Sequence, residues 1–183
     1  MKNYKKNYDL LKKNHVYSED MEHDACGVGL IASTEGKKSR KIVEYGIEAL
    51  KAVWHRGAVD ADGKTGDGAG IHVEIPKDFF IEKIEVTGHT HDNSEICVGM
   101  IFLPRNDYAA QESCKTIVES ELTKNNFSIY GWRQVPVNPK ILGEKAFQTM
   151  PEIIQVLFKS NDPNLLDKNL ERKIYETRKR IEN

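Results

Sequence analysis

The spacing of apolar residues along the chain predicts helices with one apolar face. Ser39 can cap a helix whose apolar positions recur every three or four residues as far as Trp54. We expect this helix to end near Gly57, with the glycine in the left-handed cap conformation. Similar patterns predict a helix capped by Asp107 and ended by Asn125-Asn126, a short helix or turn over 76–80, and a charged helix over 164–182.

Short apolar or alternating runs between these helices predict strands. The runs cover residues 26–33, 71–75, 96–103, 127–135 and 150–158. In the first and third runs small and apolar residues follow one another without polar interruption, which is typical of strands covered on both faces. Helices and strands are interspersed along the chain, so the order of elements favours a layered α/β or α+β domain over a helical bundle or a β-sandwich.

The composition is that of one globular domain, or of part of one. Hydrophobic residues make up 39% and charged residues 30% of the 183 positions, which excludes disordered, collagen-like and membrane-spanning classes. The 27 basic and 28 acidic residues give a net charge of -1, so the chain has no overall field to attract nucleic acid or an anionic membrane. We therefore expect neither nucleic acid nor a membrane as a partner.

The cysteine and histidine residues do not form a recognisable metal pattern. Cysteines at 26, 97 and 114 make neither a disulfide framework nor a Cys-x-x-Cys motif, so we expect a reducing, cytoplasmic location and no metal site. Cys97 is interpreted as a small core residue. His89 and His91 could hold a metal on a strand, but their segment is polar and has no third ligand nearby, so solvated histidines are the favoured interpretation.

A loop rich in Gly and Asp follows the first helix, over residues 58–70. It does not match a calcium-binding EF-hand loop, because Lys64 and Ile71 stand where oxygen ligands are needed. It does not match a phosphate-binding P-loop either, because position 58 is alanine. Two interpretations stay open: a mobile or substrate-facing loop, and a purely structural glycine turn.

Cys26 is a candidate nucleophile. It begins a glycine-flanked run, Cys26-Gly27-Val28-Gly29, after a charged leader that resembles neither a secretory signal nor a transit peptide. A cysteine reacts as the thiolate, so a base must accept its proton. If residues 1–25 were removed, the α-amino group of Cys26 itself, with a pKa of about 7.7 to 8.0, could act as that base. The alternative is a frayed N-terminal tail with no function.

These motifs closely resemble the start of the class II glutamine amidotransferase domain of the glutamate synthase large subunit. The resemblance rests on Cys26-Gly27, on His55-Arg56-Gly57 and on the Asp- and Gly-rich extension over 60–70. Residues 131–137 and 171–175 also look like this branch. The resemblance implies an α+β fold, a four-layer αββα sandwich of the N-terminal-nucleophile type, of which this chain carries the first half. It divides the chain into a leader, 1–25, and the N-terminal portion of the amidotransferase domain, 26–183.

The resemblance also implies the chemistry. Cys26 would attack the side-chain amide of L-glutamine, form a thioester and release ammonia, with Arg56 ordering the site and His55 and Gly57 shaping its turn. In the complete enzyme the ammonia would aminate 2-oxoglutarate. FMN and an iron-sulfur cluster are implied for the full-length enzyme, with no cofactor in this segment. The implied partners are the rest of the large subunit and either a small electron-transfer subunit or ferredoxin.

The chain departs from the family pattern in one respect. The Asn-Gly pair that makes the oxyanion hole, and the arginine and aspartate that hold the α-groups of glutamine, come later in family members and are not found before Asn183. An oxyanion donor contributes about two to three powers of ten in rate, so we expect these 183 residues alone to be inactive or nearly so. Two alternatives remain: a non-catalytic folding or interaction module, and the domain of another class II amidotransferase.

Overall fold

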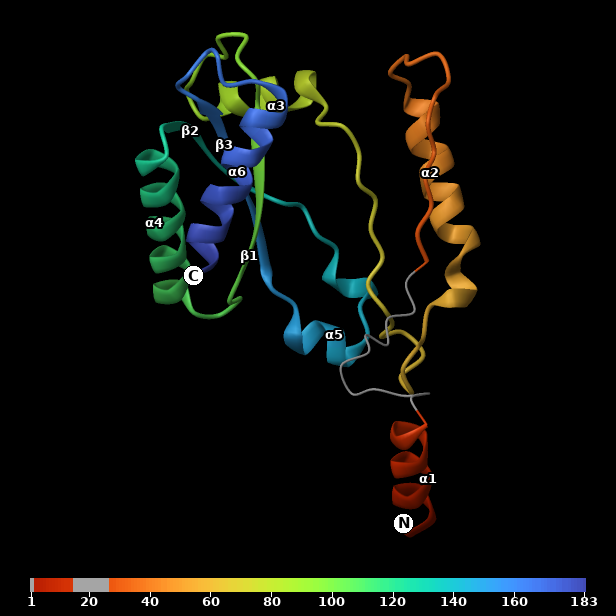
Figure 1. Cartoon of the computed structure of the whole chain (residues 1–183). Coiled ribbons are helices and arrows are strands. Elements are labelled where there is room, and N and C mark those ends of the chain that lie inside the picture. The colour runs from red at the N-terminus through yellow and green to blue at the C-terminus, as the bar shows by residue number, and fades with distance from the viewer. Residues whose placement is uncertain (1, 15–26) are drawn as a thin grey trace. The chain divides into compact units, whose positions relative to one another are not determined.

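The computed structural model describes residues 2–14 and 27–183 (Figure 1). These residues fall into two compact units. One comprises Met1–Ala58 and Gly66–Ile71, and the other comprises Val59–Thr65 and His72–Asn183. Among the described residues, no helix combines the length and the apolar character that crossing a membrane requires.

A three-stranded antiparallel sheet forms the centre of the second unit. Its strands are β1 (Cys97–Leu103), β2 (Phe127–Gln134) and β3 (Glu152–Ser160), in the order β1-β3-β2. β3 therefore lies in the middle, with Leu157 opposite Val98 on one side and Phe158 opposite Ile129 on the other. The three strands confirm the predictions for 96–103, 127–135 and 150–158. The antiparallel pairing, with helices on its faces, makes the unit α+β.

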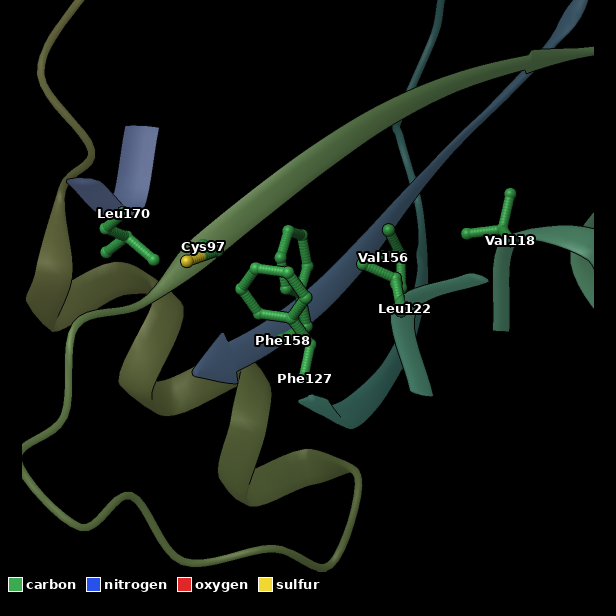
Figure 2. Close-up of a cluster of buried hydrophobic side chains, with 7 residues drawn as sticks. All are labelled: Cys97, Val118, Leu122, Phe127, Val156, Phe158 and Leu170. Atoms are coloured by element: carbon green, nitrogen blue, oxygen red, sulfur yellow. The ribbon is translucent and has the colours of Figure 1, made fainter. Parts of the chain in front are cut away.

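Two long helices cover one face of this sheet. They are α4 (Tyr108–Lys124) and α6 (Asp167–Glu182), which contact each other (Figure 1). α4 also contacts β1 and β2, and Leu170 of α6 joins the strand residues in the core. The Asp107 carboxylate accepts a hydrogen bond from the backbone N–H of Ala110 at 2.9 Å, as predicted for a helix cap. Figure 2 shows the core beneath them: Cys97, Val118, Leu122, Phe127, Val156, Phe158 and Leu170. The Phe127 and Phe158 rings meet edge to face there, with centroids 5.3 Å apart.

A shorter helix, α3 (Lys77–Val86), packs Phe80 and Ile84 against the opposite face of the sheet. Leu157 and Tyr130 belong to this second core. β1 lies at the edge of the described sheet and is covered on this side only near its start, so Phe102 remains 63% exposed. The expectation that residues 96–103 are covered on both faces is therefore wrong for the later half of the strand.

The connection between β2 and β3 contains two short helices that the proline pattern did not predict. These are η2 (Pro139–Ile141) and α5 (Glu144–Thr149). Pro139 begins η2 because its fixed φ angle suits the first position of a helix and its missing N–H has no partner to lose there. The Asn138 side chain accepts a hydrogen bond from the Lys140 N–H at 3.3 Å and completes the turn. The segment is therefore only partly the extended connection that was expected.

The first unit contains α1 (Lys2–Lys13), α2 (Arg40–Ala52) and the short η1 (Trp54–Arg56). The Ser39 hydroxyl accepts a hydrogen bond from the Lys41 N–H at 3.2 Å, which confirms the predicted cap of α2. The predicted cap at the other end is wrong. α2 ends at Ala52, with Val53 as its C-cap, and Gly57 has φ -84° and ψ 147°, an extended rather than a left-handed conformation.

Two predicted strands of the first part of the chain are not strands among the described residues. Residues 27–33 and 71–75 form no ladder with another strand, and Cys26 lies outside the described residues. Val28 is 93% and Leu30 89% exposed, where the apolar pattern predicted burial. An extended run becomes a strand only when a neighbouring chain accepts and donates its backbone hydrogen bonds, and no described strand does so for these residues.

Replacement of Leu157 by alanine tests the importance of the middle strand. Leu157 is fully buried in β3, so Leu157→Ala is expected to lower the free energy of unfolding by about 2–5 kcal/mol, through lost burial and the cavity left behind. The matched control is Ile141→Ala, which removes an apolar side chain that is 71% exposed and should change stability by less than about 0.5 kcal/mol. Urea unfolding followed by circular dichroism measures both, and equal effects would contradict this account of the core.

Candidate active site

The structure includes the backbone of Arg56, the predicted neighbour of the nucleophile, but not the nucleophile Cys26 itself. Cys26 lies outside the described residues. Arg56 ends η1, and its backbone is described while its side chain is not. The two described cysteines do not offer another nucleophile of the same kind: Cys97 is buried in the core beneath α4 and α6, and burial raises the pKa of its thiol to about 12. Cys114 lies on α4 and is half-buried.

His55 and Gly57 form a tight turn after α2. The ring nitrogen Nδ1 of the exposed His55 donates to the backbone carbonyl of Ala52 at 3.2 Å. The Gly57 N–H donates to the carbonyl of Trp54 at 3.0 Å. A Cβ at position 57 would lie 3.3 Å from that same carbonyl oxygen, so the turn is tighter than most side chains allow.

The Asp- and Gly-rich loop closes on itself immediately after this turn. The backbone N–H of Ala58 donates to Oδ2 of Asp67 at 2.8 Å, and the Asp67 N–H donates back to the Ala58 carbonyl at 3.2 Å. A Cβ at position 66 would lie 2.9 Å from the Ala58 oxygen, so glycine is needed for the two sides to approach. Farther along, the Asp60 N–H donates to the Thr65 carbonyl at 2.7 Å. The segment is thus a hydrogen-bonded turn.

The Asp62 carboxylate organises the tip of this loop. Its Oδ1 accepts from the backbone N–H groups of Lys64 and Thr65 at 2.9 and 2.7 Å, and its Oδ2 accepts from the Thr65 hydroxyl at 2.6 Å. These donors, the Thr65 hydroxyl first, lower the pKa of Asp62 from 3.8 to about 2. Because the pKa is lowered, the contacts are fully present above its ordinary value and are lost only as the pH falls through about 2.

The same carboxylate joins the loop to a distant part of the chain. The Glu144 N–H, at the start of α5, donates to Asp62 Oδ2 at 3.2 Å across 82 positions of sequence. Lys145 forms an ion pair with Asp60 beside it. Gly143 makes this approach possible, since a Cβ there would lie 2.1 Å from the Thr65 hydroxyl oxygen and 2.4 Å from Asp62 Oδ2. We refer to the Asp62 side chain with its donors from Lys64, Thr65 and Glu144 as the Asp62 clasp.

The clasp bears on the two interpretations of the loop. The Asp62 carboxylate accepts hydrogen bonds from N–H and hydroxyl donors, and the Asp60 carboxylate pairs with the Lys145 ammonium group. Such contacts are typical of a structural turn. No group of three or more metal-ligating side chains occurs among the residues that the structure describes. Sequence reasoning did not identify Asp62 or Gly143 as important. The spacing Asp62-x-x-Thr65 is a local signal for such a turn, but nothing local indicates the contact with Glu144.

The two loop histidines pack around a tyrosine. His89 and His91 place their ring centroids 6.0 and 6.4 Å from that of Tyr130, and His91 Nε2 donates to the Ser94 carbonyl at 3.0 Å. His91 is half-buried, so the interpretation of both histidines as solvated is wrong for His91. Nearby, Asp92 forms an ion pair with Lys159 of β3, and the lysine holds the pKa of that carboxyl well below its usual range.

Comparison with known proteins places the chain in a family. The profile of the glutamine amidotransferases class-II family matches residues 26–183. The chain therefore belongs to the class II glutamine amidotransferases, as its motifs predicted.

The relatives it resembles are glutamate synthases. The glutamate synthase [NADPH] large chain of Azospirillum brasilense is 52% identical over 179 residues, which is 98% of this chain and 12% of that protein. The chloroplastic ferredoxin-dependent glutamate synthase 2 of Arabidopsis thaliana is 41% identical over 175 residues, 94% of this chain and 11% of the relative. The ferredoxin-dependent glutamate synthase of Pyropia yezoensis is 39% identical, with the same coverage. The chain thus spans about a tenth of the length of these relatives.

Replacement of Gly143 by alanine tests the contact between the loop and α5. The new Cβ would collide with Thr65 and Asp62, so Gly143→Ala is expected to increase hydrogen exchange at the Lys64 and Thr65 amides at least about ten-fold. Gly68→Ala is the matched control, because a Cβ at position 68 meets nothing within 4 Å. If both variants exchange at the wild-type rate, the loop is not held by this contact.

Proposed function

We propose that this chain is the N-terminal part of the glutamine-hydrolysing domain of a glutamate synthase. The observation that supports the proposal most is that the family match covers residues 26–183 and so begins at Cys26. In the proposal residues 1–25 are a leader whose removal exposes the amine of Cys26. The relatives, all glutamate synthases, support this branch over other class II amidotransferases. Cytoplasmic location is part of the same proposal.

The proposed reaction needs only Cys26 and water as reactants with L-glutamine. The α-amino group takes the thiol proton, and the sulfur attacks the side-chain amide carbon. As the tetrahedral intermediate collapses, the C–N bond breaks and the proton passes to the departing nitrogen, which leaves as ammonia. Water, deprotonated by the same amine, then cleaves the thioester. Glutamate leaves and the thiol is restored.

The residues after α2 would serve this centre without reacting. Arg56 is proposed to lie beside Cys26 and to order its site. The support is its position in His55-Arg56-Gly57, the motif that the class II resemblance rests on. His55 and Gly57 hold the turn through their hydrogen bonds to Ala52 and Trp54, so the backbone of Arg56 is constrained on both sides.

The proposed fold is the four-layer sandwich of N-terminal-nucleophile enzymes. Its support in the second unit is a sheet with helices α4 and α6 on one face and, on the other, an apolar area of β1 that α3 leaves uncovered. Met100 and Phe102, 49% and 63% exposed, lie on that open face of β1, where a second sheet would cover them.

FMN and an iron-sulfur cluster belong to the proposed full-length enzyme and not to this segment. A cluster is bound by several cysteine thiolates. Of the described cysteines, Cys97 is enclosed in the core and its raised pKa disfavours the thiolate, while Cys114 lies alone on α4. These residues do not fit a cluster. The rest of the large subunit is the proposed partner, with either a small electron-transfer subunit or ferredoxin, since relatives of the NADPH and ferredoxin types both match.

Replacement of Cys26 by alanine tests the proposed activity in the protein expressed from its complete gene. Without the nucleophile no thioester forms, so Cys26→Ala is expected to lower glutamine hydrolysis by at least about three powers of ten. The measurement is the release of ammonia from glutamine. The control variant is Cys114→Ala, which changes a half-buried cysteine of α4 and should retain activity. Retained activity in Cys26→Ala would contradict the proposal, and the 183 residues alone should show little or no hydrolysis.

A further inference from the structure

The sheet face that carries α3 continues beyond this helix. Alternate residues of a strand share a face, so Ile153 and Gln155 of β3 lie on the same face as Leu157, which belongs to the core beneath α3. The residues directly opposite them on the neighbouring strands lie on this face as well. We call this part of the sheet the open face. It consists of Met100, Phe102, Arg133, Ile153 and Gln155.

Arg133 is a half-buried cation on the open face. Its Nη1 donates to Oε1 of Gln155 at 2.7 Å, and its guanidinium carbon lies 5.1 Å from the centroid of the Phe79 ring of α3. None of the acidic side chains that the structure describes forms an ion pair with it. An arginine side chain stays protonated in proteins, and both of its partners here are neutral. The positive charge therefore has no opposite charge within the described residues.

The guanidinium group of Arg133 is held over the sheet. A surface arginine usually extends its charged group into water along an apolar stem. Here the group binds Gln155, a buried residue of the middle strand, which lies directly opposite both Arg133 and Met100. The row from Met100 through Gln155 to Arg133 thus runs across all three strands. Anything that covers Met100 and its neighbour Phe102 also lies close to this charge.

The apolar part of the open face indicates that it is an interaction surface. Met100 and Phe102 are both exposed, although they lie on one face of the same strand. A segment that covered them would also remove water from Arg133. Burying a charge costs free energy unless an opposite charge and hydrogen bonds compensate it. A segment with only apolar side chains would therefore be a poor partner, and a basic segment would be repelled.

We propose that the open face binds an apolar segment of the rest of the large subunit that carries an aspartate or glutamate, whose carboxylate pairs with Arg133. The inference rests on the proposed function, which supplies the rest of the large subunit as the partner. The bond to Gln155 uses one nitrogen of the guanidinium group. The other nitrogens offer the donors that a carboxylate accepts through two parallel hydrogen bonds.

Carbodiimide coupling of Arg133→Lys tests the proposal in the protein expressed from its complete gene. The reagent joins a lysine amine to an adjacent carboxylate as an amide and takes up the water that is lost. Peptide mapping by mass spectrometry is expected to find residue 133 linked to an aspartate or glutamate outside residues 1–183. Arg105→Lys is the matched control, because Arg105 also lies against an aromatic ring, that of Phe147, and is not on the open face. It should not link to the same segment.

Three results would overturn the proposal. They are the absence of any link at residue 133, a link to an acidic residue within 1–183, and a link to a different polypeptide or a second copy of this one. The last two would mean that the open face has another partner. A small-molecule carboxylate at Arg133 would also leave residue 133 without a link to the protein.

Cysteine labelling tests the cover on the open face with Arg133 unchanged. Phe102→Cys and Ile141→Cys place thiols at two positions that are both exposed in this structure, and only the first lies on the open face. In the protein from the complete gene, a maleimide is expected to label position 102 at least about ten-fold more slowly than position 141, because covered positions react only through local opening. Equal labelling rates would overturn the proposal even if Arg133→Lys did not fold.

The outcomes also separate this inference from the function on which it rests. If Cys26→Ala hydrolyses glutamine normally, the proposed function fails, whatever is linked to residue 133. If Cys26→Ala is inactive and residue 133 forms no link, the proposed function stands and the open face has no acidic partner.

Discussion

The second unit depends on β3 being paired along both edges and covered on both faces. Val156 and Phe158 point into the core beneath α4 and α6, and Leu157, between them, points into the core beneath α3. Successive residues of a strand face opposite sides, so this single run organises both hydrophobic cores. The strand also carries Lys159, whose ion pair with Asp92 holds the loop before β1. Without β3, α4 and α6 on one face and α3 on the other would have no shared strand to pack against.

This arrangement gives the glycine-rich loop a firm support. α5 stands directly before β3, and the Asp62 clasp ties the loop to the first N–H of α5. A chain segment that composition alone describes as flexible is thus held by backbone hydrogen bonds at its base and its tip. Flexible composition and a fixed conformation are compatible, because the glycines are needed for close approach: positions 66 and 143 have no space for a Cβ.

The sequence predicted those features that local chemistry determines. Ser39 and Asp107 cap their helices because a hydroxyl or carboxylate one position before a helix can accept a free N–H wherever the rest of the chain lies. The strands of the second unit followed from apolar runs for a similar reason. Features that need a distant partner were not predictable in this way. Val28 and Leu30 have a strand pattern, yet a strand requires pairing, and the contact of Asp62 with Glu144 joins positions 82 apart.

The site was recognised through motifs more than through geometry. Cys26, His55, Arg56 and Gly57 were identified from their resemblance to a family, and the match over residues 26–183 places the chain in that family. The structure adds what the motifs do not contain: the turn that holds Arg56, and the clasp that holds the loop behind it. Gly57 shows the limit of local rules, because its role is a tight extended turn and not the left-handed cap that its position after a helix indicated.

Cys26 is the proposed N-terminal nucleophile of this protein. Peptide mapping by mass spectrometry tests it most directly, on protein purified from its complete gene and treated with the diazoketone analogue of glutamine. We expect a first peptide that begins at Cys26 with the analogue on its sulfur, and an unlabelled Cys97 in the core. An active protein that retains residues 1–25, or that carries the label on another residue, would contradict the claim.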